Sequence, residues 1–283
     1  MNIRWVIQNN LISQLEFKLL KESCDKLGVE VEEIEVIPFS AELPKFTMDE
    51  KTNIYYGSTT LMYNIYHQLN NPTGLFFDES AFSMENYINK WGKHMLNSDA
   101  DITSFKEVTQ KQYPDDQIFF IRPDDDSKSF AGTTMTFKQI KDWGSNITQY
   151  DNVTLTQDTK IVVSEPYNIR KEWRTYIVDG KVSTASRYRE NFRLSKSGTD
   201  IPDDMIQFVE DRCKEYQPYG AFVMDIALCG DNYYIIECGC INSVGLYDSD
   251  VKKLVTDISK YVNKKSILDK CVVTSKKSYK GTL

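Results

Sequence analysis

The sequence predicts an α+β protein that is preceded by a small α/β domain. Two observations carry this prediction: strand-like and helix-like segments alternate in the first 80 residues, and later strands come in antiparallel pairs between helices. With 283 residues the chain is long enough for one large or two modest domains with a buried core. Its 41% hydrophobic and 27% charged residues are typical of a soluble globular protein.

The N-terminal segment, residues 1–80, has the pattern of a small parallel-sheet domain. Ile3–Gln8 is a short apolar strand, and Ser13 is placed to cap a helix that Gly28 ends. Val29–Ile37 alternates apolar and acidic residues, as a half-buried strand does, and Asn53–Tyr56 is a further strand. A helical pattern follows, with apolar residues at Leu61, Ile65 and Leu69. This β-α-β-β-α order favours parallel strands.

Residues 81–263 form the predicted second domain, and two hairpins are its clearest elements. Asp179-Gly180 joins Glu172–Val178 to Val182–Tyr188, because this dipeptide between alternating runs is a strong turn signal. The second hairpin pairs Ala221–Leu228 with Tyr233–Glu237. Further strands are predicted at Gln117–Arg122 and Ile161–Ser164, and helices at Thr136–Gly144, Pro202–Tyr216 and Val251–Val262. The lysine-rich residues 264–283 are interpreted as a solvated basic tail.

Two carboxylates in the second hairpin are the strongest functional signal. Asp225 lies inside an apolar run, and Glu237 ends another. Burying a carboxylate among apolar neighbours is costly unless a cation or a hydrogen-bond donor compensates it. On paired strands both can face one cleft, where such hard oxygen ligands suit magnesium bound together with substrate phosphates. The alternative is that each carboxylate takes part in a structural hydrogen bond or salt bridge.

The wider pattern around these carboxylates resembles the ATP-grasp superfamily. Asp225, Glu237 and the following Asn242 match the order in which that family holds magnesium against ATP. Phe119–Pro123 is similar to the strand that carries a phosphate-binding lysine before a proline, and Lys128–Gly132 takes the place of the phosphate-covering loop. Val162–Ile169 looks like the hinge between the lobes. The resemblance runs from Gln117 to Val262, and a little-characterised clade of bacteria and their phages is the most similar part of the family.

This resemblance implies an ATP-grasp fold, in which two α/β lobes grip ATP, and ATP with Mg²⁺ as cofactors. It implies metal ligation by Asp225, Glu237 and Asn242, and phosphate binding by Arg122 and Lys128. Nucleotide contacts would come from the hinge and from the ribose-binding carboxylate seven residues after Glu165, that is from Ser164, Glu165, Pro166, Tyr167, Ile169 and Glu172. Arg174 and Arg187 would lie towards the phosphates or the acceptor, and a catalytic role falls to Arg122, Lys128 and Arg187.

Two departures from the family pattern stand out. Arg122 replaces the usual lysine, and Gly239 stands where many relatives carry the asparagine two residues after the glutamate. The asparagine role is therefore assigned to Asn242. The second phosphate-binding lysine of the family has its best counterpart in Lys93.

The function that the resemblance implies is an ATP-dependent ligase, which joins a carboxylate to an amine or thiol through an acylphosphate. Two alternatives remain: a kinase that phosphorylates a small molecule, and a non-catalytic module that binds nucleotide or a partner protein. The expected substrates are small-molecule or peptide carboxylates and amines, and nucleic acid stays open as an acceptor. The net charge of −7 argues only against a nucleic-acid-binding face spread over the whole molecule.

The remaining features favour a cytoplasmic protein without a membrane span. Arg4 interrupts the only early apolar run, so no secretory signal is visible, and no segment approaches the roughly 20 apolar residues that cross a bilayer. Six cysteines in a chain with an adequate core need no disulfide framework. The two histidines make a zinc site improbable. Cys238 and Cys240 are interpreted as buried small hydrophobes, with soft-metal ligation as the alternative.

Overall fold

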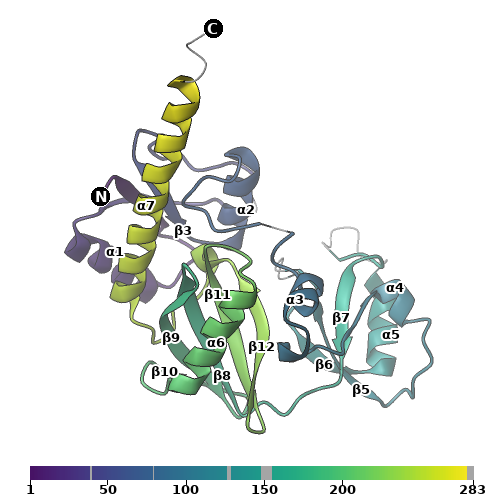
Figure 1. Ribbon diagram of the computed structural model, residues 1–283. Coiled ribbons are helices and arrows are strands. Elements are labelled where there is room, and N and C mark those ends of the chain that lie inside the picture. Colours follow the sequence, from purple (N-terminus) through teal and green to yellow (C-terminus); the bar gives the residue numbers. More distant parts are fainter. Residues whose placement is uncertain (39, 79, 126–128, 148–154, 279–283) are drawn as a thin grey trace.

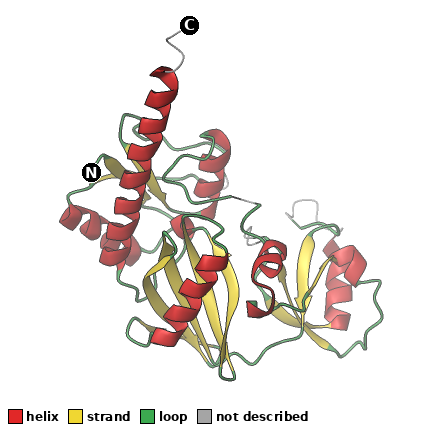
Figure 2. Cartoon of the chain, viewed as in Figure 1, coloured by secondary structure: helices red, strands yellow, loops and turns green. Residues whose placement is uncertain are grey.

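The computed structural model describes residues 1–38, 40–78, 80–125, 129–147 and 155–278, with side chains up to residue 269. Three separate β-sheets organise this part of the chain. In Figure 1 the five-stranded sheet lies between the N-terminal sheet and the four-stranded sheet that carries β5 to β7. Figure 2 shows that helices cover each of the three sheets.

The first sheet is parallel, as the sequence predicts, with the strand order β2-β1-β3. Its elements are β1 (Ile3–Gln8), α1 (Gln14–Leu27), β2 (Glu30–Ile34), β3 (Thr52–Tyr56) and α2 (Thr59–Gln68). Gly28 ends α1 with a left-handed backbone, at φ 65°, which a residue without a side chain adopts at little cost. Trp5 of β1 donates a hydrogen bond to Ser259 in the last helix, so the two ends of the chain pack together.

The second sheet is antiparallel, with the order β10-β9-β8-β11-β12. Its strands and the helix that packs on it are β8 (Lys171–Val178), β9 (Lys181–Glu190), β10 (Arg193–Ser197), α6 (Asp203–Glu215), β11 (Ala221–Cys229) and β12 (Asn232–Gly239). Both predicted hairpins are present, as β8–β9 and β11–β12. Strand β11 is buried along almost its whole length, because the sheet is covered on both faces.

The third sheet is also antiparallel, with the order β4-β7-β5-β6. It comprises β4 (Asp101–Ser104), α4 (Phe105–Val108), β5 (Ile118–Pro123), β6 (Thr133–Thr136), α5 (Phe137–Asn146) and β7 (Lys160–Ser164). This unit has its own hydrophobic core, formed by residues 105–163. Before it come α3 (Met84–Trp91) and η1 (Gly92–His94), and η3 (Ile241–Ser243) follows β12.

The last helix, α7 (Val251–Ser278), corrects the interpretation of the C-terminal segment. Residues 264–278 are helical rather than a separate solvated tail, and Ser266 is buried against β3, where its hydroxyl lies 2.7 Å from that of Thr52. Lysine is a good helix former, so a lysine-rich segment continues a helix that is already anchored by packing. None of the described helices is both long and apolar enough to cross a membrane.

Candidate functional site

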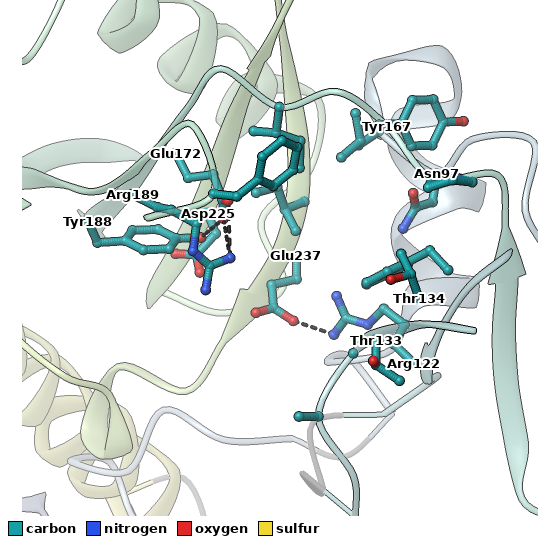
Figure 3. A pocket seen from close by; sticks show the side chains of 18 of the residues that line it. Asn97, Arg122, Thr133, Thr134, Tyr167, Glu172, Tyr188, Arg189, Asp225 and Glu237 are labelled. Carbon is teal, nitrogen blue, oxygen red and sulfur yellow. Dashed lines mark hydrogen bonds and ion pairs between the residues drawn. The ribbon is translucent and has the colours of Figure 1, made fainter. Parts of the chain in front are cut away.

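A cleft of about 780 Å³ lies between the five-stranded and four-stranded sheets. Its walls come from strands of both sheets and from the segment that joins β7 to β8 (Figure 3). Of the predicted site residues, eight line this cleft: Arg122, Pro166, Tyr167, Ile169, Glu172, Arg174, Asp225 and Glu237. The fold therefore brings together side chains that lie up to 115 residues apart in the sequence.

The two carboxylates of the β11–β12 hairpin are direct neighbours. Asp225 and Glu237 are register partners on adjacent antiparallel strands, so their side chains leave the same face of the sheet. Asp225 is only 2% exposed, although it lines the cleft. Burial raises the pKa of the Asp225 carboxyl, and the nearby Glu237 acts in the same direction.

Arg174 compensates the buried charge of Asp225. It occupies the position on β8 that pairs with Asp225 on β11, and its Nε and Nη2 atoms donate to the two carboxylate oxygens at 2.9 and 2.8 Å. Burial alone would lower the pKa of Arg174, but the attraction of Asp225 outweighs it and raises that pKa further. A two-pronged pair of this kind fixes the orientation of the carboxylate.

Arg122 reaches Glu237 from the opposite side of the cleft. It lies on β5 of the four-stranded sheet, and its Nη2 atom forms an ion pair with Glu237 Oε2 (Figure 3). This pair joins the two sheets across the cleft. The guanidinium is therefore placed beside the carboxylates, as the prediction of a phosphate-binding cation requires.

Glu172 is buried at the end of the cleft where Tyr188 and Arg189 lie. Its carboxylate accepts a hydrogen bond of 2.6 Å from the Tyr188 hydroxyl and another of 3.1 Å from Arg189 Nη1. The Tyr188 ring stacks on that of Tyr247, and the Arg174 guanidinium lies over both rings at 5.8 and 5.2 Å from their centroids. A continuous chain of contacts thus links Glu172 to Asp225.

The predicted hinge, Ser164–Ile169, is only partly turned toward the cleft. Pro166, Tyr167 and Ile169 line it, whereas Ser164 is buried and donates a 3.4 Å hydrogen bond to Asn97. The Glu165 side chain is exposed and does not contribute to the walls.

Asn242, the predicted third metal ligand, does not lie in the cleft. Its Oδ1 atom accepts from the backbone N–H of Phe76 at 2.8 Å, and its Nδ2 atom donates to the carbonyls of Tyr55 and Gly74. These bonds occupy the amide in joining η3 to the first sheet. The assignment to the metal is corrected on this ground, because position along the chain did not reveal that the strand turns away after Gly239.

Arg187 is likewise held away from the cleft. It pairs with Glu190 and Asp200, both at 2.7 Å, and donates to Ser195, so it fastens β10 onto β9. Lys93 is exposed in η1 and does not line the cleft. Lys128 lies outside the described residues.

Sequence reasoning missed Asn97, Tyr188, Arg189 and Tyr247, which line the cleft. The ladder between β8 and β9 shifts between Glu172 and Trp173, opposite Arg189 and Arg187, so that Tyr188 occupies a β-bulge. A bulge redirects side chains in a way that strict alternation does not predict. The buried Cys238 and Cys240 belong to the hydrophobic core, and no cluster of three metal-binding side chains is found among the described residues.

Comparisons with known proteins place this arrangement in a family. A model of the ATP-grasp domain, that of family 3 in one clade of the superfamily, matches residues 63–258, which is more than half of the chain. The chain therefore belongs to the ATP-grasp superfamily, as the resemblance predicted. Enzymes of this superfamily use ATP with Mg²⁺, and the fold class expected from the sequence is confirmed. No curated protein matches the sequence.

Solved structures with the same fold include three ligases or synthetases. The D-cycloserine synthetase DcsG is 10% identical, with a TM-score of 0.60 over 92% of this chain and 99% of that one. The D-alanine–D-alanine ligase from Bacillus anthracis is 11% identical, with a TM-score of 0.56 over 94% and 99%. The ATP-grasp ligase PsnB, complexed with minimal precursor, Mg and ADP, is 11% identical, with a TM-score of 0.54 over 93% and 99%.

The residues present fit a magnesium ion that is bound together with nucleotide. Asp225 and Glu237 supply hard oxygen ligands from one face of the sheet, and the crowding of negative charge around Asp225 is the condition that a divalent cation relieves. Magnesium takes its remaining ligands from phosphates and water in sites of this kind, so two protein carboxylates suffice.

Proposed function

We propose that this protein is an ATP-dependent ligase that joins a carboxylate to an amine through an acylphosphate. One observation carries the proposal: the Asp225–Glu237 register pair faces Arg122 across the cleft. This places two anionic metal ligands and one fork-shaped cation around a common point, which is the requirement of phosphoryl transfer from a metal-bound nucleotide.

In this proposal the nucleotide spans the cleft. Pro166, Tyr167 and Ile169 receive the base, Glu172 binds the ribose hydroxyls, and Arg122 binds the phosphates, with Lys128 as a further phosphate ligand. Asp225 and Glu237 hold Mg²⁺, which neutralises charge on the phosphates. Arg174 acts through Asp225, because its two hydrogen bonds keep that carboxylate ionised and oriented.

The proposed chemistry has two steps. A substrate carboxylate oxygen attacks the γ-phosphorus, the bond from that phosphorus to the bridging oxygen breaks, and ADP leaves. The amine then attacks the acyl carbon, loses a proton, and expels inorganic phosphate. Arg122 stabilises the charge that spreads over the transferred group in the first step. Exclusion of water protects the acylphosphate, which the enclosed position between two sheets supports.

The relatives of the same fold support the substrate class in general terms. They include a D-alanine–D-alanine ligase and a ligase complexed with a precursor peptide, so both amino acids and peptides are proposed as substrates. The acceptor among them is left to experiment.

Product analysis tests the proposal. The protein is incubated with ATP, Mg²⁺ and pools of carboxylic acids and amines, each alone and combined, and ADP, phosphate and acceptor masses are measured. A ligase forms ADP and phosphate only when a carboxylate and an amine are both present, with a product that has lost one water. A phosphorylated hydroxyl acceptor without released phosphate would instead establish a kinase. Turnover that Asp225→Asn leaves unchanged would contradict the metal site.

A further inference from the structure

Asn97 is a buried polar residue of the cleft for which the proposed chemistry has no role. It is 2% exposed and lines the cleft beside the predicted hinge. Figure 3 shows its side-chain amide pointing toward the middle of the cleft, between Tyr167 and Thr134. Its position therefore combines burial in the protein with access to a bound molecule.

The backbone around Asn97 is held firmly. Leu96 donates a 2.8 Å hydrogen bond to the carbonyl of Ile235 on β12, and Met95 forms an isolated parallel bridge with the same residue. The Asn97 carbonyl in turn accepts from the N–H of Ala100. These bonds attach the segment to the five-stranded sheet, so the Asn97 side chain has a defined place relative to Glu237 on the same strand β12.

Ser164 sets the orientation of the amide. The Ser164 hydroxyl, at the end of β7, donates to Asn97 Oδ1, which identifies the other end of the amide as the Nδ2 donor. In the described part of the chain, no acceptor for Nδ2 is found. A buried amide donor without a protein acceptor is costly, and a ligand that offers an acceptor removes that cost.

We propose that Asn97 reads the base of the bound nucleotide, by donating from Nδ2 to a ring nitrogen of adenine. This inference rests on the proposed function, because that function places a nucleotide in the cleft. Leu96 and Ile236 supply apolar surface near Asn97 for the faces of a purine ring, and Tyr167 lies beside it. Adenine presents ring nitrogens as acceptors along its edges, which match a donor fixed at the side of such a slot.

A nucleotide-analogue experiment tests this directly. Binding of ADP with Mg²⁺ is measured by calorimetry for the parent, Asn97→Ala and Asn97→Leu, and repeated with 1-deaza, 3-deaza and 7-deaza analogues, each of which lacks one ring nitrogen. Loss of Nδ2 should weaken ADP binding about 10-fold, the scale of one hydrogen bond. One analogue should bind the parent about 10-fold more weakly than ADP, and both variants should abolish that difference alone.

Two matched variants control for stability and orientation. Asn64 is also buried, but it donates to the Ser40 carbonyl far from the cleft walls, so Asn64→Leu should leave the analogue pattern unchanged. Ser164→Ala should weaken ADP binding less than Asn97→Ala does. Asn97→Leu has nearly the volume of asparagine, and thermal melting verifies that it folds.

The outcomes separate the two levels of the proposal. If the variants keep the whole analogue pattern of the parent, or weaken all the nucleotides equally, Asn97 does not read the base and the inference is overturned while nucleotide binding stands. If the parent binds no adenine nucleotide, the proposed function fails, and this inference fails with it.

Discussion

The two walls of the cleft are built in different ways. The five-stranded sheet supplies Glu172, Asp225 and Glu237, on strands packed between two hydrophobic clusters. The four-stranded sheet supplies Arg122, and its unit packs around a separate core of residues 105–163. The carboxylates thus depend on the largest core of the molecule, whereas the cation belongs to a smaller unit and meets them through one ion pair. Charge of one sign is fixed in advance, and charge of the other sign is brought to it.

The largest expected effect concerns the carboxylate wall. Asp225→Asn or Glu237→Gln should lower Mg²⁺-dependent ATP turnover by at least about 100-fold, because each removes an anionic metal ligand. Both changes are nearly isosteric, and melting temperature reports whether the fold is kept. Asp231→Asn, in the exposed turn of the same hairpin, is the matched control and should be silent. Normal turnover by either cleft variant would assign the metal elsewhere.

Arg122 tests the opposite wall. Arg122→Ala should reduce turnover more than Arg122→Lys, and the lysine variant should still lose roughly 1–3 kcal/mol, because an ammonium lacks the two-pronged grip of a guanidinium. Turnover at limiting and saturating ATP measures both effects. Arg193→Lys, on the exposed strand β10, is the control. An Arg122→Ala protein as active as the parent would remove this residue from the site.

Glu172 tests the nucleotide end of the carboxylate wall. Glu172→Ala should weaken ATP binding about 10-fold while the magnesium dependence remains, because it removes an acceptor for ribose but leaves Asp225 in place. Glu165→Ala should have less effect, since the Glu165 side chain does not line the cleft. Calorimetry with ATP compares the two. Equal affinities of the Glu172 variant and the parent would exclude the ribose role.

Metal removal should have the smallest effect on the fold. Asp225 and Glu237 each pair with an arginine without any metal, so a chelator should abolish turnover and leave the melting temperature unchanged. A thermal melt with and without chelator, in the absence of nucleotide, measures this. A marked drop in melting temperature would identify a structural metal instead.

Local patterns were sufficient to predict the elements but not all of the site. The parallel first sheet and both hairpins follow from alternation and turn signals, and the juxtaposition of Asp225 with Glu237 follows from the β11–β12 pairing. Asn242 was misplaced because its partners, at Phe76, Tyr55 and Gly74, come from a distant part of the chain. The extent of α7 depended in the same way on packing against β3, which no local pattern contains.

The arginine partners of the carboxylates mark a similar boundary. The sequence predicted that Asp225 needs compensation, yet whether Arg174 or Arg187 provides it depends on which residue lies opposite Asp225 in the β8–β11 ladder. That register places Arg174 there, whereas Arg187 pairs with Glu190 and Asp200. Long-range register is set by the whole sheet, so a single sequence does not fix it.

The attachment of Asn242 has a mechanical consequence for the exchange of bound molecules. Three buried hydrogen bonds fix the chain just beyond β12 to the first sheet, so these two parts form one rigid body. Any widening of the cleft must then be a rotation of the four-stranded unit alone. The bond between Leu96 and Ile235 lies where that unit meets β12, and it is the natural pivot for such a rotation. The gate of this protein is thus the smaller lobe, and the carboxylates remain stationary while it opens.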